Sequence, residues 1–327
     1  MIIISIIKIF HFRQIEGTGS EITHIAENKH SRNEFSVSTK TGFYYANKAV
    51  GVVKDFSSLL KTFGVVDISG FVPVSKTSFI FSDKSLRCLI ALNTQTQSAS
   101  RYAGKCGSVA PHQSGDASKV IFSSPGQSVL NVKKRLIYVI DSDYICRLNL
   151  DSKKMTDILP QPFFEKFLAL TADSKLEHLY ASTASVILKV STTTGSIRTL
   201  SLFKKGNTKN QSPQSFFSHS ISMTFISQDY IIRSDSIGSE LMIGDLKKGL
   251  AGTTCLSNPP LIPCHIPLYP SALLFRAFQK EVIVGGQNGI IVVIPVSGML
   301  FVVCLFFVVS AVHFAPYLTG LSSMMLI

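Results

Sequence analysis

The sequence contains no tryptophan and few charged residues, 16% compared with roughly a quarter in an average soluble domain. Long runs of Ala, Glu, Lys and Leu are also missing, which excludes a coiled coil. Because 46% of its 327 residues are hydrophobic, the chain is long and apolar enough to bury a sizeable core. Its 23 phenylalanines and many Val, Ile, Ser and Thr residues favour strands, so we expect an all-β fold.

Charge is absent from the C-terminal part of the chain, where no Asp, Glu, Lys or Arg follows Glu281. Within this part, residues 299–317 form an apolar run that would span a hydrocarbon layer of about 30 Å as a helix. We therefore expect a transmembrane helix over 299–317, followed by a short tail, 318–327. The alternative is a buried core segment, although core strands run only about four to eight residues before a turn.

The N-terminus, residues 1–20, is apolar enough for a signal peptide, although Lys8 interrupts it and no basic segment precedes it. A cleaved signal would make the chain a single-pass membrane protein with its main domain in the lumen or outside the cell. Without one, the C-terminal span predicts a tail-anchored protein that faces the cytosol.

Between the two ends, a short strand that ends in a turn residue recurs about every 48 residues. The six copies are 51–55, 89–93, 147–151, 187–191, 241–245 and 291–295. Each follows another short strand, and inner strands such as 35–38 and 167–171 come earlier still. Each copy is therefore predicted to be a four-stranded meander, with strands A to D from the inside outward.

One such meander cannot bury both of its faces, but a closed ring of meanders can. Six copies predict a six-bladed β-propeller over residues 21–296. The sixth blade has strands A to C at about 272–294 and then enters the apolar tail, so its outer strand is missing. We expect residues 22–26 to fill that place and close the ring. The competing candidate for the outer strand, 299–307, would expose an apolar face to water.

The second and third copies resemble the NHL repeat family over residues 78–160. The resemblance is carried by a strand ending in Asp83, an Ala-Gly turn at 103–104, a Gly-Asp loop at 115–116 and a Ser-Pro-x-Gly-like turn at 122–126. Phe79 stands where the family more often has tyrosine, and Cys88 and Cys146 replace its usual arginine. The fourth to sixth copies lack the Ala-Asp and Ser-Pro-x-Gly signals.

The resemblance implies a non-enzymatic scaffold that recognises a protein or peptide through its loops. Some NHL propellers of the tripartite-motif group bind RNA, but that function needs aromatic residues among the cations, and these are few here. A third class is a metal-dependent propeller lyase or lactonase. The amidating lyases hold zinc with histidines in the central channel, whereas only His219 is predicted near an inner strand. His178 falls on a second strand, and His112 and His265 fall in loops.

No phosphate-binding, nucleotide-binding or hydrolase motif is present, so we expect no catalytic residue and no cofactor. The six cysteines contain no Cys-x-x-Cys pair, which disfavours zinc. Cys88 and Cys146 occupy equivalent positions and are interpreted as small core residues. Cys255 and Cys264 flank a proline-rich loop and either form a disulfide or remain as two buried thiols. Asn210 lies in the only glycosylation sequon.

The turns of the meanders predict a basic face. In a meander, the A–B and C–D turns lie on one side of the ring, and the B–C turns and D–A connections lie on the other. The cations assigned to the first side are Lys40, Lys54, Lys76, Lys133, Lys134, Arg135, Lys153, Lys154, Lys175, Lys247, Lys248 and Lys280. The membrane segment leaves from the same side, so these residues could contact anionic headgroups. The alternative is that they are ordinary solvated turn residues.

Overall fold

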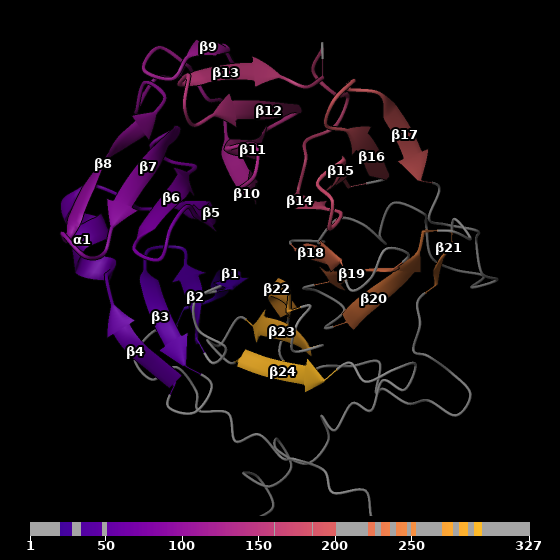
Figure 1. Ribbon diagram of the computed structural model, residues 1–327, viewed down its shortest axis with the longest axis horizontal. Coiled ribbons are helices and arrows are strands. Elements are labelled where there is room, and N and C mark those ends of the chain that lie inside the picture. Colours follow the sequence, from indigo (N-terminus) through magenta and orange to yellow (C-terminus); the bar gives the residue numbers. More distant parts are fainter. Residues whose placement is uncertain are drawn as a thin grey trace, which may run out of the picture.

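In the residues that the computed structural model describes, six antiparallel sheets surround a common centre (Figure 1). The structure describes residues 20–27, 34–47, 51–159, 161–184, 186–200, 222–225, 230–235, 240–246, 250–252, 270–276, 281–286 and 291–295. In this part of the chain one short helix accompanies the strands. The fold is therefore all-β and propeller-like, as the composition and the repeats predict.

The first three sheets follow one another along the chain. The first contains β1 (Ile22–Glu27), β2 (Glu34–Thr39), β3 (Phe43–Asn47) and β4 (Gly51–Asp55). The second contains β5 (Ile68–Pro73), β6 (Ser78–Asp83), β7 (Cys88–Asn93) and β8 (Ser98–Ala103). The third contains β10 (Pro125–Asn131), β11 (Leu136–Asp141), β12 (Tyr144–Asn149) and β13 (Lys154–Asp157), and β9 (Gly115–Asp116) is added at its outer edge.

The remaining three sheets repeat the same consecutive pairing. The fourth contains β14 (Ala169–Ala172), β15 (His178–Ser182), β16 (Ile187–Ser191) and β17 (Ile197–Leu200). The fifth contains β18 (Met223–Phe225), β19 (Tyr230–Asp235), β20 (Glu240–Asp245) and β21 (Leu250–Gly252). The sixth has three strands in the described part of the chain, β22 (Pro270–Arg276), β23 (Glu281–Gly286) and β24 (Ile291–Pro295).

Strand composition follows position in the sheet. The second strands β6 and β11 are buried from their second residue onward, because neighbouring sheets cover both of their faces, and β11 is a nearly continuous apolar run. The outer strand β8 is mostly exposed and has the polar sequence SASRYA. This difference in composition between buried and exposed strands lets the sequence distinguish inner from outer strands.

The predicted closure of the ring by residues 22–26 is wrong. Strand β1 pairs with β2 and is the innermost strand of the first sheet, not the outer strand of the sixth. The predicted inner strand 35–38 is therefore the second strand, and 51–55 is the outermost. A hairpin between strands only six residues apart in sequence closes a much shorter loop than pairing across the whole chain, which favours the local partner.

Sheet-to-sheet packing still joins the first and last sheets. Ile22, Val37 and Phe35 of the first sheet share one buried cluster with Ala272 and Ile283 of the sixth. A Cβ atom added to Gly285 would lie 2.7 Å from Ile22 Cγ2, so β23 and β1 pack in close contact. Between the fifth and sixth sheets, the Leu273 amide donates to Ser222 Oγ at 3.1 Å. Neighbouring sheets are thus in contact around the ring.

The short helix α1 (Ser57–Thr62) occupies the connection from β4 to β5. Leu60 is fully buried and packs in the cluster that joins the first two sheets. The helix is followed by Gly64, whose φ of +85° is the left-handed conformation that ends many helices. The chain then turns back into β5 at the centre of the ring.

Candidate functional site

The long connection between β8 and β10 builds a polar cluster against the third sheet. Its backbone is fixed at several points: the Gly104 amide donates to Ala117 O, and the Ala117 amide donates to Lys153 O, both at 2.8 Å. Strand β9 within this connection pairs with β13, where Met155 lies opposite Gly115. The connection is therefore anchored along the outer edge of the third sheet.

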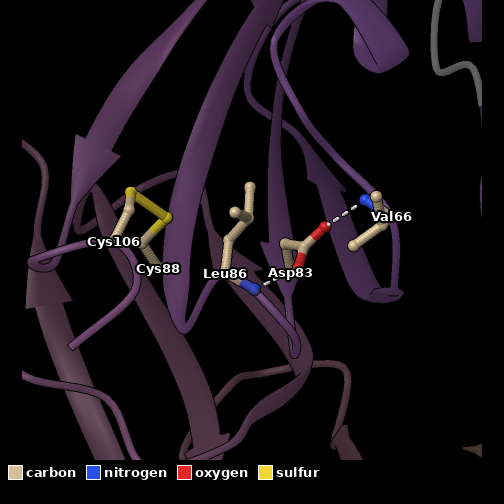
Figure 2. Close-up of a disulfide and its surroundings, with 5 residues drawn as sticks. All are labelled: Val66, Asp83, Leu86, Cys88 and Cys106. Carbon is tan, nitrogen blue, oxygen red and sulfur yellow. Dashed lines mark hydrogen bonds between the residues drawn. A yellow bond between two sulfur atoms is a disulfide. The ribbon is translucent and has the colours of Figure 1, made fainter. Parts of the chain in front are cut away.

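A disulfide holds the start of this connection. Cys88, on β7, is bonded to Cys106, and the two Cα atoms lie 5.1 Å apart (Figure 2). The prediction that Cys88 is only a small core residue is therefore wrong. Its partner lies in a loop whose path the sequence does not reveal, so no pattern could match the two. The predicted partners Cys255 and Cys264 lie outside the described residues.

Two buried aspartates end the second strands of the second and third sheets. The Asp83 carboxylate accepts hydrogen bonds from the amides of Val66 in the preceding connection and Leu86 in the following turn, at 2.9 and 2.6 Å (Figure 2). It also accepts the Asp67 amide at 3.1 Å. Asp141 is equivalent and accepts the amides of Ser123 and Ser124 at 2.9 and 2.6 Å. Both carboxylates therefore fasten a D–A connection to the sheet that follows it.

The third sheet differs in its turn after the aspartate. Four residues separate β6 from β7, but only Ser142 and Asp143 separate β11 from β12. In the described part of the chain, no amide of this shorter turn donates to Asp141, and a side chain from another connection contacts the carboxylate instead. That side chain is His112, whose Nδ1 lies 2.6 Å from Asp141 Oδ2.

His112 is held on every side. Its Nε2 lies 2.9 Å from Asp157 Oδ1 and 4.0 Å from Cys146 Sγ. The Tyr144 ring stacks on the imidazole at a centroid distance of 4.0 Å, and Ser114 Oγ donates to Asp157. The His112 side chain is 4% exposed, that of Asp141 0%, and that of Asp157 27%. We call His112, Asp141, Cys146 and Asp157 the His112 cluster.

The carboxylates control the protonation of this cluster. Burial alone would lower the pKa of His112, but its hydrogen bonds to Asp141 and Asp157 outweigh burial and raise the pKa to about 9. Burial would raise the pKa of Asp157, yet the bonds from His112 and Ser114 hold it below its ordinary value. Burial, together with the two carboxylates, raises the pKa of the Cys146 thiol well above its ordinary value.

The order Ser114, His112, Asp141 is similar to a hydrolase triad, but its hydrogen bonds do not suit catalysis. A general base needs a free imidazole nitrogen that can take the serine proton. Here both ring nitrogens face carboxylates, and the Ser114 hydroxyl donates to Asp157 while Nε2 lies 3.5 Å away. An imidazolium that is bonded in this way cannot act as the base.

The cluster does contain three groups suited to a metal ion. His112 Nε2, Cys146 Sγ and Asp157 Oδ1 all lie within 4.8 Å of one another. The sequence predicts His112 in a loop and Cys146 as a small core residue, and the structure brings the two together. The site lies on β12, β13 and the connection, so none of its three ligand groups comes from an innermost strand.

The predicted basic residues lie on both sides of the ring. Those placed as predicted, in A–B or C–D turns, are Lys76, Lys133, Lys134, Arg135, Lys153 and Lys175, and Lys154 begins β13 on the same side. Lys40 lies in the B–C turn of the first sheet and Lys54 near the D–A end of β4, because that sheet starts one strand earlier than predicted. Their assignment to the first side is therefore wrong. Lys247, Lys248 and Lys280 lie outside the described residues.

The opposite side also carries cations, including Lys61, Lys84, Lys105, Lys119 and Lys166. Among the described residues, lysine positions therefore do not distinguish one side as the basic one. Several predicted cations also have local partners: Arg135 Nε lies 2.6 Å from Asp151, and Lys153 Nζ lies 2.6 Å from the Tyr102 hydroxyl.

Other sequence candidates fall into two groups. His178 is bonded locally, with its Nδ1 2.9 Å from Asp173. Asn210, His219, His265 and the segment 299–317 lie outside the described residues. No helix in the described part of the chain is long and apolar enough to cross a membrane.

Three of the five large apolar residues that are exposed in the described part of the chain lie on the side of the D–A connections, which we call the D–A face. Val66, Val109 and Phe164 are 50%, 82% and 76% exposed. They occupy three successive D–A connections, from the first sheet to the fourth. On the other side, Val132 in an A–B turn and Ile197 at the start of β17, after a C–D turn, are also exposed, at 53% and 45%.

Comparisons with known proteins support the fold. No family model matches the sequence, and no similar sequence is found among curated proteins. Among solved structures, the extracellular domain of a putative one-component system from B. thetaiotaomicron aligns with a TM-score of 0.51 and 14% identity. The alignment covers 84% of this chain but only 34% of that one.

A second similar structure comes from a nidogen/laminin complex. It aligns with a TM-score of 0.53 and 10% identity, over 71% of this chain and 79% of that one. At such low identity, these likenesses establish the all-β propeller-like fold alone.

Proposed function

We propose that this chain is a membrane-tethered, non-enzymatic β-propeller of the NHL type that recognises a protein or peptide on its D–A face. In this proposal each of the six sheets is one blade. Support comes from the consecutive strand pairing and from the buried clusters shared by neighbouring sheets. One similar structure is an extracellular domain and the other belongs to a protein complex, which agrees with a recognition role.

The apolar residues of the D–A face carry the proposal. Scattered apolar residues on a surface are normal, but Val66, Val109 and Phe164 occupy the same side of three successive sheets. Exposed side chains of this kind bind a partner by losing their contact with water. A partner with a complementary apolar strip along its length would contact all three.

The connections that bear these residues are anchored, which lowers the entropic cost of binding. The Val66 amide is bonded to Asp83 at 2.9 Å. The connection of Val109 is held by the Cys88–Cys106 disulfide and by His112. Beside Phe164, the Phe163 amide donates to Asp143 O at 2.8 Å.

Photo-crosslinking in cells tests this function. A photoreactive amino acid at position 109 or 164 of the full-length chain should give discrete crosslinked species, and one at position 132 on the opposite side should not. Protease, but not nuclease, should remove the added mass if the partner is a protein. Nuclease sensitivity would favour the RNA-binding alternative, and equal crosslinking at 109 and 132 would contradict the proposed face.

The membrane tether rests on the sequence of residues 299–317. The full-length chain should remain in the membrane fraction after alkaline carbonate extraction, whereas a chain ending at residue 296 should be released. Release of both would contradict the tether without affecting the proposed recognition face.

A further inference from the structure

We propose that His112, Cys146 and Asp157 bind a divalent transition-metal ion of the Zn²⁺ type, with Asp141 orienting the imidazole. This inference is independent of the proposed recognition function. It rests on the placement of three different ligand groups at one point between the β8–β10 connection and the third sheet.

The distances already approach those of a metal site. Ligand atoms at about 2.0 Å (His N, carboxylate O) and 2.3 Å (Cys S) from a tetrahedral ion are separated by roughly 3.3–3.6 Å. His112 Nε2 lies 2.9 Å from Asp157 Oδ1 and 4.0 Å from Cys146 Sγ. Shifts of a few tenths of an ångström, a small outward movement of Asp157 and an inward one of Cys146, would bring both distances into this range.

The imidazole is oriented as in known zinc sites. Ligating histidines commonly donate their second N–H to a carboxylate, which fixes the tautomer and the ring plane. Asp141 provides this carboxylate at 2.6 Å from Nδ1, and it is fixed by the amides of Ser123 and Ser124. Stacking on Tyr144 holds the ring plane as well. Nε2 is therefore directed at Asp157 and Cys146 before any ion binds.

The exchange of protons for a metal ion balances in charge. Binding would release the Nε2 proton of His112 and the Sγ proton of Cys146 to solvent, and the two positive charges of the ion would replace them. Asp157 contributes its existing negative charge, so the net charge of the cluster stays the same. A set of one thiolate, one imidazole and one carboxylate favours Zn²⁺ over the harder ions Mg²⁺ and Ca²⁺.

The three ligands leave a fourth coordination position. Ser114 Oγ is 3.5 Å from Nε2 and bonded to Asp157, so Ser114 or a water molecule could fill it. The ion would connect the β8–β10 connection, through His112, to β12 and β13. It would thereby stabilise the surface that carries Val109.

Titration with Co²⁺ tests the proposal, because a Co²⁺–thiolate bond gives a charge-transfer band and tetrahedral Co²⁺ gives intense visible bands. The untagged full-length chain, in detergent without chelator or reductant, should bind one equivalent of Co²⁺ with both features. Zn²⁺ should displace the Co²⁺, and Ca²⁺ should not.

Variants show where the ion binds. Cys146→Ser should remove the charge-transfer band, and Asp157→Asn should weaken binding by about tenfold or more. Asp116→Asn, which changes an exposed carboxylate on β9, should bind as the wild type does. If Cys146→Ser does not fold, Asp157→Asn still tests the proposal, because Asp157 is partly exposed and its replacement should not prevent folding. Absence of Co²⁺ and Zn²⁺ binding, or a band unchanged in Asp157→Asn, would overturn the proposal and leave an ion-paired cluster.

Discussion

His24 on β1 is a histidine without a hydrogen-bond partner in the described structure. Both of its ring nitrogens are buried, and its ring meets Phe71 edge-on at a centroid distance of 6.5 Å. Burial lowers the pKa of His24 to about 4. The native structure therefore holds the neutral imidazole, and protonation favours the unfolded chain.

We expect His24 to make the protein less stable in acid. A histidine with a lowered native pKa contributes its full stability above the ordinary value of about 6.5, and the contribution is lost as the pH falls toward 4. Replacing His24 by Phe should remove up to about 3 kcal/mol of this loss, because no group is left to protonate. Denaturant unfolding at pH 7 and pH 4.5 measures the difference between variant and wild type. An identical pH dependence would contradict the assignment.

Removing the buried carboxylate of Asp83 should destabilise the protein more than removing an exposed carboxylate. Asp83→Ala would leave the amides of Val66, Asp67 and Leu86 without their acceptor, so the free energy of unfolding should fall by about 3 kcal/mol or more. Asp151→Ala, which removes only the exposed partner of Arg135, should have a much smaller effect. Thermal unfolding of both variants provides the measurement, and equal shifts would contradict the anchoring role of Asp83.

The sequence places Asp83 at the strand end of the NHL-like motif, but it does not reveal the amides that the carboxylate accepts. It reveals the role of His112 even less. His112 lies 29 and 45 residues from Asp141 and Asp157, in a connection with no periodic pattern. Only the path of that connection brings the three together. The two-residue turn after Asp141 is the one signal that could have indicated a substitute donor.

At the scale of elements, the β8–β10 connection depends on its disulfide. Cys88 and Cys106 enclose a loop with a sequence separation of 18, and closing such a loop in the unfolded chain stabilises the native state by about 3 kcal/mol. The double variant Cys88→Ala/Cys106→Ala should lose about this amount, as measured by denaturant unfolding. Mild reduction of the wild type should have the same effect.

A control separates the crosslink from the loss of buried sulfur. The single variant Cys106→Ala leaves Cys88 in its buried position and breaks only the bond. It should lose most of the stability that the double variant loses. If it is as stable as the oxidised wild type, the disulfide does not restrain this connection.

At the scale of the whole molecule, the sequence predicts the positions of the repeated strands better than it predicts how the ring closes. The second to sixth units have their second and third strands at or close to the predicted positions, because alternation and turn residues are local signals. The largest shift is in β12, which begins three residues before the predicted 147–151. The first unit is displaced by one strand, because β1 pairs with β2 and not with the sixth sheet. Which partner it takes depends on chain entropy and on packing across the ring, and neither is a local property of residues 22–27.

Contact between the first and sixth sheets predicts energetic coupling between the two ends of the ring. Ile22 and Ile283 are fully buried in one cluster, so replacing either by Ala should reduce the free energy of unfolding by about 2–5 kcal/mol. In a double-mutant cycle their effects should differ from additivity by about 0.5 kcal/mol or more, because each packs against the same neighbours. Ile22→Ala combined with Leu179→Ala, whose side chain is buried between the third and fourth sheets, should be additive. Additivity in both cycles would mean that the first and sixth sheets do not support each other, and the ring would then be open at this point in solution.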